Sequence, residues 1–421
     1  MDVWIAGTVF VVAYALIAID RIDRTIVALL AGMAVVALGI IDQHEAFAAI
    51  DLNVIFLLAG MMVIASTLAT TGFFDWLAVR SVRLSRGEPF RLLIILSIVT
   101  AVLAAFLDNV TTVVLTTPIT LSVAGRLGVS PTPYLISQIF ASNIGGTATL
   151  IGDPPNILIG SAAGLDFGAF LVNLAPVTVL IFLAFMVMMR FAFRSSLQVP
   201  DGQREAALEG TEATTITNRP LLVRTLLVAG LTTAGFLAHS ALGLEAATVA
   251  LLGATILLLV GRIDPHVAFR EIEWSTLFFF VGLFVLVESV VAVGIVDAAA
   301  DWLVDAAGGD LGLASLGLLW FSAIASAIID NIPYTATAIP VVERLVDSGL
   351  ESAPLWWSLA LGACLGGNLT IVGASANVVV ANLASRAGHP IRFVEFLRLG
   401  AGVVLMSLAV STVYVWLRYL S

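Results

Sequence analysis

The chain has 421 residues, of which 60% are hydrophobic and only 11% are charged. Soluble globular domains carry about 25% charged residues, so this composition excludes a soluble enzyme, a disordered chain and a nucleic-acid-binding protein. It indicates a membrane protein with many spans, each built from the roughly 20 apolar residues that cross a bilayer. The formal net charge is −10, and all 19 basic residues are arginines.

Apolar segments follow one another from the start of the chain. The first, residues 3–19, lacks the basic residues that open a signal peptide, so we expect a retained span. The spans predicted for the first half are 3–19, 25–41, 52–71, 133–165 and 168–190. Those predicted for the second half are 221–241, 246–260, 274–296, 354–385 and 394–417.

Two further apolar segments, 91–125 and 312–347, are interrupted in the middle by the dipeptide Asp-Asn. Each arm has about 16 residues, roughly 24 Å of helix at 1.5 Å per residue. That length is short for a span and typical of one arm of a hairpin that enters the membrane and returns. We therefore predict two re-entrant hairpins.

The two halves of the sequence repeat each other. The segment 25–47 resembles the segment 247–269, which lies 222 residues further along. The dipeptide Asp108-Asn109 recurs as Asp330-Asn331 at the same spacing. We expect residues 1–192 to form one repeat, residues 193–220 a polar cytoplasmic linker, and residues 221–421 the second repeat.

The predicted topology follows from the number of crossings in each repeat. If the hairpins do not cross, each repeat crosses five times, and an odd number inverts the second repeat relative to the first. With the N-terminus outside, 17 of the 19 arginines face the cytoplasm, as the positive-inside rule requires. Both termini are then outside, together with an acidic loop at 297–310 that contains Asp297, Asp301, Asp305 and Asp310.

The predicted fold class is an all-α polytopic membrane protein. It contains two inverted repeats, about ten transmembrane helices, two re-entrant hairpins and two broken helices. The broken helices are the spans that contain 142–157 and 364–378, because each has a Gly-Gly pair and a later glycine followed by short polar residues. Irregular backbone inside a membrane is tolerated only where it is buried in protein or lines a cavity. The symmetry of the repeats brings these breaks and the hairpin tips to a common midplane.

Buried carboxylates are the predicted coupling groups. They are Asp108 and Asp330 at the hairpin tips, Asp153 in the first broken span and Glu288 within the span 274–296. Each of the three aspartates also suits the role of helix N-cap, although serine or asparagine caps a helix without the cost of a buried charge. Burial favours the protonated carboxyl and a bound cation favours the ionised one, so such a group can exchange H⁺ for a cation, with Na⁺ at Asp108 and Asp330 as one case. Glu288 matches Ser66 in the other half, and a structural carboxyl is the alternative there.

Amide and hydroxyl side chains at the same places are the predicted substrate contacts. They are Asn109, Thr111, Thr112, Asn143, Thr147, Asn156, Asn331, Thr335, Asn368 and Asn377. Their alternative role is to satisfy the irregular backbone of the tips and breaks. The single cysteine excludes an intrachain disulfide and a cysteine-rich metal site, and the absence of P-loop and dinucleotide motifs gives no reason to expect a cofactor.

Four segments carry a resemblance to a known family. They are FLDNVTTVVLTTPIT (106–120), SNIGGTATLIGDPPNILIGSAAG (142–164), IIDNIPYTATAIPVV (328–342) and LGACLGGNLTIVGASANVV (361–379). They resemble the arsenite permease/sodium–proton antiporter group of the ion-transporter superfamily, especially P-protein-like permeases, over about residues 25–417. The chain is more distantly similar to divalent-anion/sodium symporters. The resemblance implies a homodimer with a mobile transport domain that moves as an elevator, and it implies that the tip residues lie at the site. In those symporters the tips read Ser-Asn-Thr, whereas here they read Asp-Asn, which favours proton or cation exchange.

The expected function is proton-coupled secondary transport by alternating access, and not catalysis. The leading substrate prediction is arsenite or antimonite, exported in exchange for H⁺, because neutral As(OH)₃ can bind amides and hydroxyls. The alternatives are a Na⁺/H⁺ antiporter and an organic-anion or chloride permease. Hairpins that enter from both faces fit alternating access better than they fit a channel. The sequence contains neither the nucleophile–His pattern nor the HExxH motif of an intramembrane enzyme. The expected partners are a small inorganic solute, H⁺, possible Na⁺, the lipid bilayer of a prokaryotic plasma membrane, a second copy of the chain and a cytoplasmic ATPase subunit, and no nucleic acid.

Overall fold

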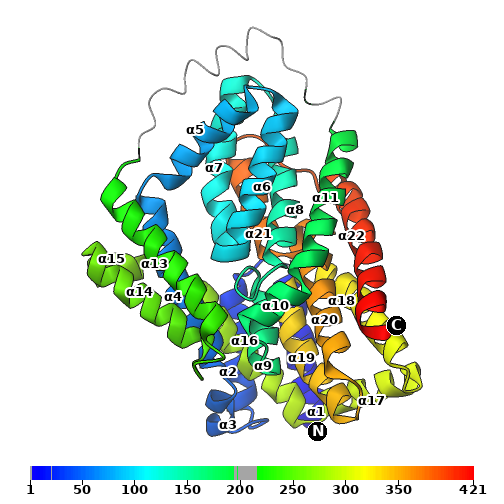
Figure 1. Cartoon of the computed structure of the whole chain (residues 1–421). Helices are drawn as coiled ribbons and strands as arrows, with labels where there is room; N and C mark the ends of the chain where they lie inside the picture. Colours follow the sequence, from blue (N-terminus) through cyan, green and yellow to red (C-terminus); the bar gives the residue numbers. More distant parts are fainter. Residues whose placement is uncertain (1, 20, 194–196, 198–215) are drawn as a thin grey trace.

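The computed structural model describes residues 2–19, 21–193, 197 and 216–421, and all regular elements in these ranges are helices (Figure 1). The first half contains α1 (Asp2–Ile19), α2 (Arg24–Ala37), α3 (Gln43–Ala48), α4 (Leu52–Thr70), α5 (Phe73–Ser85), α6 (Pro89–Leu107), α7 (Asn109–Leu127), α8 (Thr132–Gly146), α9 (Pro154–Ala163), α10 (Phe167–Asn173) and α11 (Ala175–Ala192). The second half contains α13 (Arg219–Ala238), α14 (Ala246–Gly261), α15 (Pro265–Arg270), α16 (Trp274–Ala292), α17 (Ile295–Ala307), α18 (Leu311–Ile328), α19 (Asn331–Asp347), α20 (Ser352–Gly366), η1 (Ile371–Gly373), α21 (Ser375–Arg386), α22 (Phe393–Val415) and η2 (Trp416–Leu420). The predicted linker 193–220 falls mostly outside the described residues.

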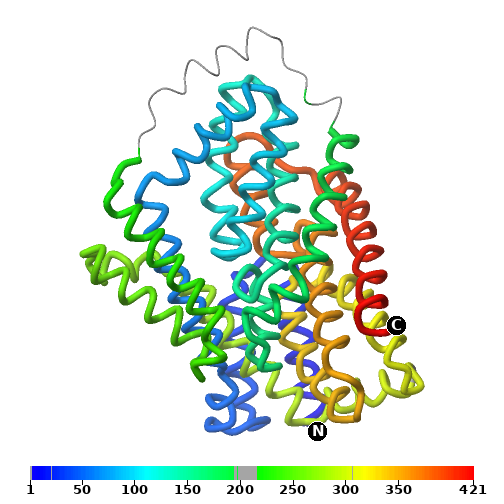
Figure 2. The backbone as a smooth tube through the Cα atoms, in the orientation of Figure 1, coloured from blue at the N-terminus to red at the C-terminus, as the bar shows by residue number. Residues whose placement is uncertain are grey.

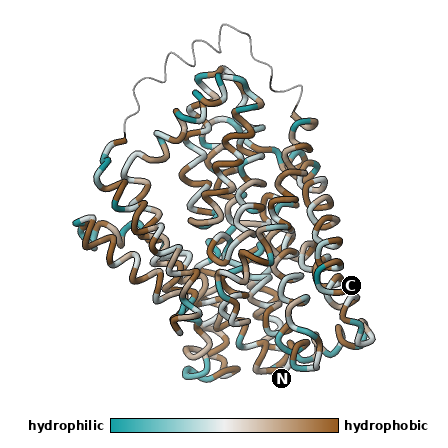
Figure 3. Tube along the Cα trace, in the orientation of Figure 1, coloured by the Kyte–Doolittle hydropathy of each residue, from teal (hydrophilic) through white to brown (hydrophobic). Residues whose placement is uncertain are grey.

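Long apolar helices dominate the molecule. Within the ranges described, nine helices are long and apolar enough to cross a membrane, and the pair α9 and α10 passes the same test with a 116° bend between its members. Hydrophobic residues cover most of the helix lengths, while hydrophilic residues gather toward many of the helix ends (Figure 3). These observations confirm the prediction of an all-α protein with many membrane spans.

The helix boundaries differ from the prediction in three places. The segment 297–310 is not a loop over most of its length, because α17 begins at Ile295 and ends at Ala307. Its two ends are set by Gly294 and Gly308, which both adopt positive φ, and alanines fill much of the helix between them. A second helix that the sequence reading did not assign, α5, precedes the first hairpin. The hairpin arms have 17 to 19 residues and so exceed the predicted length.

The helices pair in the same way in both halves. Helix α6 packs against α8 as α18 packs against α20, and α4 packs against α14 as α2 packs against α16. Like the contacts of α4 with α14 and of α2 with α16, two further contacts join the two halves: α7 contacts α21, and α19 contacts α9. Figures 1 and 2 show the α6–α7 hairpin at the top of the view and the α18–α19 hairpin toward the bottom. Each hairpin therefore packs against the broken span of the other half.

Glycine permits the close packing of α8 on α6 and of α20 on α18. A Cβ atom on Gly145 would lie 2.2 Å from the carbonyl oxygen of Ala101, and one on Gly366 would lie 2.4 Å from that of Ala323. Both distances are far inside van der Waals contact, so only glycine fits at either place. The Gly-Gly pairs of the sequence thus hold each hairpin arm against the broken helix that carries the polar residues.

Candidate functional site

Each hairpin turns at a single aspartate. Asp108 and Asp330 have φ angles of 86° and 53°, in the region that non-glycine residues rarely adopt. The carboxylate of Asp108 accepts a hydrogen bond of 2.9 Å from the amide of Thr111, and that of Asp330 accepts one of 3.0 Å from the amide of Ile332. Both tip aspartates therefore cap the helix that follows, which was the alternative to a coupling role.

Asp153 lies between the two tips and is fully buried. Its Oδ1 atom accepts a hydrogen bond from the side-chain amide of Asn109 at 3.2 Å and another from that of Asn331 at 3.1 Å. One donor comes from each half of the chain. A single carboxylate thus joins the tip of the first hairpin to the tip of the second.

The two prolines that follow Asp153 explain why its carboxylate is available. Asp153 occupies the N-cap position of α9 but makes no capping hydrogen bond with its side chain. A capping side chain accepts from the second or third amide of the helix. The second position is Pro155, which has no N–H, and the third amide, that of Asn156, bonds to the main-chain oxygen of Asp153 at 2.9 Å.

Asparagine side chains extend the network across the two halves. The amide of Asn109 also donates to Oδ1 of Asn143 at 3.1 Å. The amide of Asn143 donates in turn to Oδ1 of Asn368 at 3.0 Å and to Oδ1 of Asn377 at 2.9 Å. These contacts connect the first hairpin, the first broken span and the second broken span in one hydrogen-bonded chain.

Asn156 and Asn377 hold the open ends of the broken helices. The amide of Asn156 lies 2.8 Å from the carbonyl oxygen of Thr149 and 3.1 Å from that of Thr147. The amide of Asn377 lies 2.7 Å from the carbonyl oxygen of Gly367 and 2.9 Å from that of Thr370. Helix ends leave such carbonyls without partners, so both asparagines satisfy the irregular backbone.

Cys364 belongs to the same network. It occupies the place in the second half that Asn143 occupies in the first, 221 residues earlier. Its thiol donates to Oδ1 of Asn156 at 3.4 Å, as the amide of Asn143 donates to Oδ1 of Asn377. The sequence reading missed this residue, although the spacing of the repeat identifies it.

Among the residues that the structure describes, three buried polar atoms of predicted site residues have no hydrogen-bond partner. They are Oδ1 of Asn109, Oγ1 of Thr112 and Nδ2 of Asn368. Buried polar atoms are nearly always paired, so unpaired ones on Asn109 and Asn368, two members of the network, indicate a place for water or a small solute.

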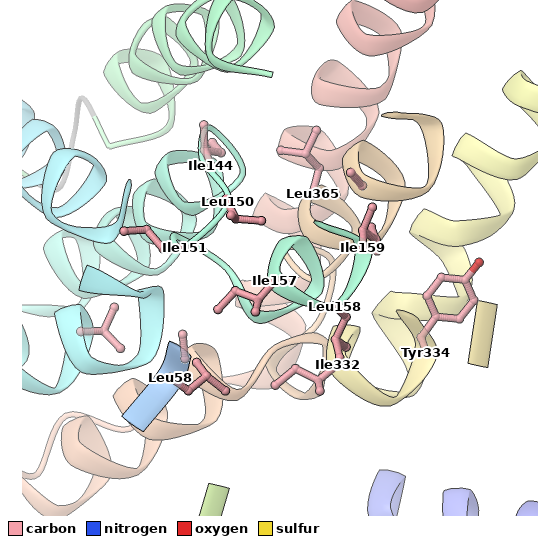
Figure 4. Close-up of a cluster of buried hydrophobic side chains, with 14 of the residues drawn as sticks. Leu58, Ile144, Leu150, Ile151, Ile157, Leu158, Ile159, Ile332, Tyr334 and Leu365 are labelled. Carbon is pink, nitrogen blue, oxygen red and sulfur yellow. The ribbon is translucent and has the colours of Figure 1, made fainter. Parts of the chain in front are cut away.

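A cluster of buried apolar side chains is formed by residues of the same segments (Figure 4). Ile144, Ile157, Ile332 and Leu365 each directly follow one of the polar members of the network in the sequence, and all four are buried. Such apolar surroundings lower the local dielectric constant and strengthen the hydrogen bonds beside them.

The predicted threonines make mainly local contacts. Oγ1 of Thr147 donates to the carbonyl oxygen of Asn143, and Oγ1 of Thr335 donates to that of Asn331, both at 2.7 Å. Thr111 lines a cavity of about 370 Å³ beside the first tip, together with Glu271 and Glu273. The structure therefore places an acidic wall near the first tip.

Glu288 is the predicted coupling residue that lies on neither a tip nor a broken span. It is partly buried on α16, which packs against α3. Its coupling role stays a prediction.

Arg24 is a second site residue that was not predicted from the sequence. The positive-inside rule placed it among the 17 arginines on the cytoplasmic side. Its guanidinium lies 3.4 Å from the carboxylate of Asp330 and donates to the hydroxyl of Ser375. The signal available in the sequence was weak, because Arg24 and Asp330 are 306 residues apart.

Comparisons with known proteins agree with this fold. Residues 14–362 match the family described as CitMHS, citrate transporter. The crystal structure of the YdaH transporter of Alcanivorax borkumensis superposes with a TM-score of 0.59 over 99% of this chain and 98% of that chain. Its sequence identity is 15%, so this likeness concerns the fold alone.

Several relatives have sequences similar to nearly the whole length of this chain. The uncharacterized transporter Rv2684 of Mycobacterium tuberculosis is 44% identical over 99% of this chain and 98% of its own. The 46 kDa membrane protein of Mycobacterium leprae is 43% identical over 99% of each chain. The P protein of Mus musculus is 32% identical over 100% of this chain and 61% of its own. These matches confirm the P-protein-like part of the predicted resemblance, while the arsenite permease group stays a prediction. The chain is a multi-pass membrane transporter and belongs to the CitMHS citrate transporter family.

Proposed function

We propose that the protein is a proton-coupled secondary transporter in which Asp153 carries the proton. The observation that supports this most directly is the position of Asp153, a fully buried carboxylate whose partners are the neutral amides of both hairpin tips. A carboxylate without a cationic partner in such a place is neutralised by a proton or by a bound cation.

The chemistry of a carboxyl group links its proton to the tips. The ionised form accepts hydrogen bonds only, so it holds the amides of Asn109 and Asn331 at the same time. In the protonated form one oxygen carries a hydrogen and becomes a donor. The other oxygen still accepts from the amides, but the group has lost its negative charge, so both hydrogen bonds weaken and the proton on Asp153 thereby changes how firmly the halves are joined.

The proposed substrate is a small solute rich in oxygen atoms. The unpaired amide and hydroxyl groups of Asn109, Asn368 and Thr112 are neutral, which suits the predicted arsenite or antimonite, exported in exchange for H⁺. An organic anion is the second candidate, and Arg24 beside the second tip favours it. A Na⁺/H⁺ antiporter is the third, with Na⁺ at the tip carboxylates.

The wider architecture is part of the proposal. Two inverted repeats, an elevator-like movement of the hairpins and broken helices, a homodimer and termini outside a prokaryotic plasma membrane are consistent with the paired helix contacts and with the placement of arginines. Single cysteines placed on α17 in a Cys364→Ser background test the orientation. Labelling of α17 from the cytoplasmic side contradicts it.

The coupling proposal is tested in liposomes that contain a pH-sensitive dye. Arsenite, citrate and Na⁺ are added in turn, and the coupled solute changes the internal pH of wild-type vesicles. Asp153→Asn is expected to abolish this change. Asp166→Asn is the matched control, because Asp166 only caps α10 in the same half and asparagine caps equally well. A pH change that persists in Asp153→Asn overturns the proposal.

A further inference from the structure

The surroundings of Arg24 differ from those of an ordinary loop arginine. Its side chain is 27% exposed and lies at the start of α2. The guanidinium carbon lies 5.2 Å from the centre of the Phe279 ring, in a cation–π contact with α16. The carboxylate of Asp330 and the hydroxyl of Ser375 meet the same guanidinium nitrogen, and Ser375 also donates to that carboxylate at 2.8 Å.

A cavity opens directly beside this cluster. It has a volume of about 210 Å³, and its polar lining consists of Asp23, Arg24, Asp330, Ser375 and Asn382. The carboxylate of Asp23 is engaged with the amide of Thr25 at the start of α2. The cavity is large enough for several non-hydrogen atoms and has the guanidinium in its wall.

The other half of the chain forms a cavity that corresponds to this one at several positions and has no arginine in its lining. The corresponding cavity of about 330 Å³ is lined by Ala246 where the first has Arg24, by Glu245 where it has Asp23, and by Ser161 where it has Asn382. Asp108 and Pro154, the counterparts of Asp330 and Ser375, do not line it, so the whole cluster around Arg24 belongs to one of the two cavities. Arg24 adds a positive charge on one side alone, which points to a role in the function rather than in the fold.

The carboxylate of Asp330 occupies the position that an external anion would take. A guanidinium offers five N–H donors and pairs well with carboxylates. In this arrangement one Asp330 oxygen caps α19 and the other meets Arg24 and Ser375. The contact of 3.4 Å is a loose one, so a ligand carboxylate that enters the cavity can compete for the same donors.

We infer that Arg24 and Ser375 form the anion-recognition part of the transport site, and that a carboxylate of the substrate takes the place held here by the carboxylate of Asp330. This inference rests on the proposed transport function and, from the contacts of Arg24, selects its second candidate, the organic anion, over arsenite. It makes Arg24 a specificity-determining residue, and it makes Asp330 an internal competitor of the substrate.

The competition gives the two partners opposite effects on binding. Citrate serves as the carboxylate probe and arsenite as the neutral probe, with affinity measured by ligand-dependent thermal stabilisation of the purified chain in detergent. Asp330→Asn keeps the N-cap, removes the competing charge and is expected to tighten citrate binding about tenfold. Arg24→Gln is expected to weaken it tenfold or more, and Arg21→Gln, an exposed neighbour, to leave it unchanged.

Two results contradict the inference. One is equal weakening of citrate binding by Asp330→Asn and Arg24→Gln, because a purely structural ion pair predicts the same sign for both. The other is a wild-type chain that binds arsenite and not citrate. If Arg24→Gln does not fold, Ser375→Ala replaces it, and unchanged citrate binding in that variant also contradicts the inference.

The binding measurement is independent of the proton-coupling proposal, because it uses no gradient. Asp153→Asn is expected to bind citrate while losing the pH change in liposomes. Persistent coupling in Asp153→Asn together with citrate binding through Arg24 overturns the coupling proposal alone. Loss of the pH change in Asp153→Asn, together with citrate binding that Arg24→Gln leaves unchanged, overturns the anion-site inference alone.

Discussion

The contact between α6 and α8 predicts a large effect for Gly145→Ala. The new Cβ atom would lie 2.2 Å from the carbonyl oxygen of Ala101, and both groups belong to rigid helices, so no rotamer change can relieve the clash. The helices must separate by about 1 Å, and such overpacking costs about 1–3 kcal/mol, with the upper end appropriate for backbone against side chain. Alanine recovers about 1 kcal/mol of helix propensity relative to glycine. The expected net loss is about 2 kcal/mol of stability.

Gly125→Ala is the matched control for this prediction. Gly125 also lies in a helix, α7, but nothing approaches its Cβ position within 4 Å. The same substitution should therefore stabilise the protein by about 0.5–1 kcal/mol. Thermal unfolding of both variants in one detergent compares them directly. The close contact is refuted if the Gly145→Ala variant unfolds at the same temperature as the Gly125→Ala variant or at a higher one.

Three further predictions concern other contacts. Cys364→Leu leaves Oδ1 of Asn156 without its thiol donor and should cost about 1–3 kcal/mol in thermal unfolding, whereas Cys364→Asn should restore most of that loss; equal stability of the two variants contradicts the contact. Tyr14→Phe removes the hydroxyl that donates to the carbonyl oxygen of Pro333 at 2.8 Å, and about 1 kcal/mol of stability should go with it; an unchanged unfolding temperature contradicts this. Asp297→Asn breaks an exposed ion pair between α17 and α19 and should change stability by less than about 1 kcal/mol, so a larger loss shows that the pair is not a surface contact.

The positions of the breaks and tips could be predicted from the sequence for a physical reason. Polar residues and glycines are costly inside an apolar span, so Asp108, Asp330 and the Gly-Gly pairs stood out against their surroundings. The internal repeat then assigned equivalent roles to both halves. The structure brings each hairpin into contact with the broken span of the other half, while their common midplane in the membrane stays a prediction.

The different roles of the three aspartates, two of which cap helices while the third joins the tips, were harder to predict. N-capping by Asp108 and Asp330 depends on amides that the local sequence supplies, whereas the side chain of Asp153 is free of capping because prolines follow it. The Asp-Pro-Pro sequence contained that information. The link from Asp153 to both tips was beyond reach, because it depends on how two distant hairpins pack.

The role of Arg24 in the site was not predicted, for a different reason. The positive-inside rule treats an arginine near a helix end as a marker of topology, and that reading hides a role in a site. The contact with Asp330 joins residues from opposite halves, and only tertiary packing places them together. The helix α17 was missed because its aspartates resemble a solvated loop, although alanines and apolar residues between them favour a helix.

The most direct test of the central claim is the thermodynamic dependence of transport on the proton gradient. In vesicles loaded with the transported solute on both sides, the external pH at which net flux is zero is measured as the solute gradient is varied. Wild-type protein should show a zero-flux pH that shifts with the solute gradient. Asp153→Asn should still exchange solute across the membrane, with a zero-flux condition independent of pH. A zero-flux pH that shifts in Asp153→Asn as it does in wild type contradicts the assignment of the proton to Asp153.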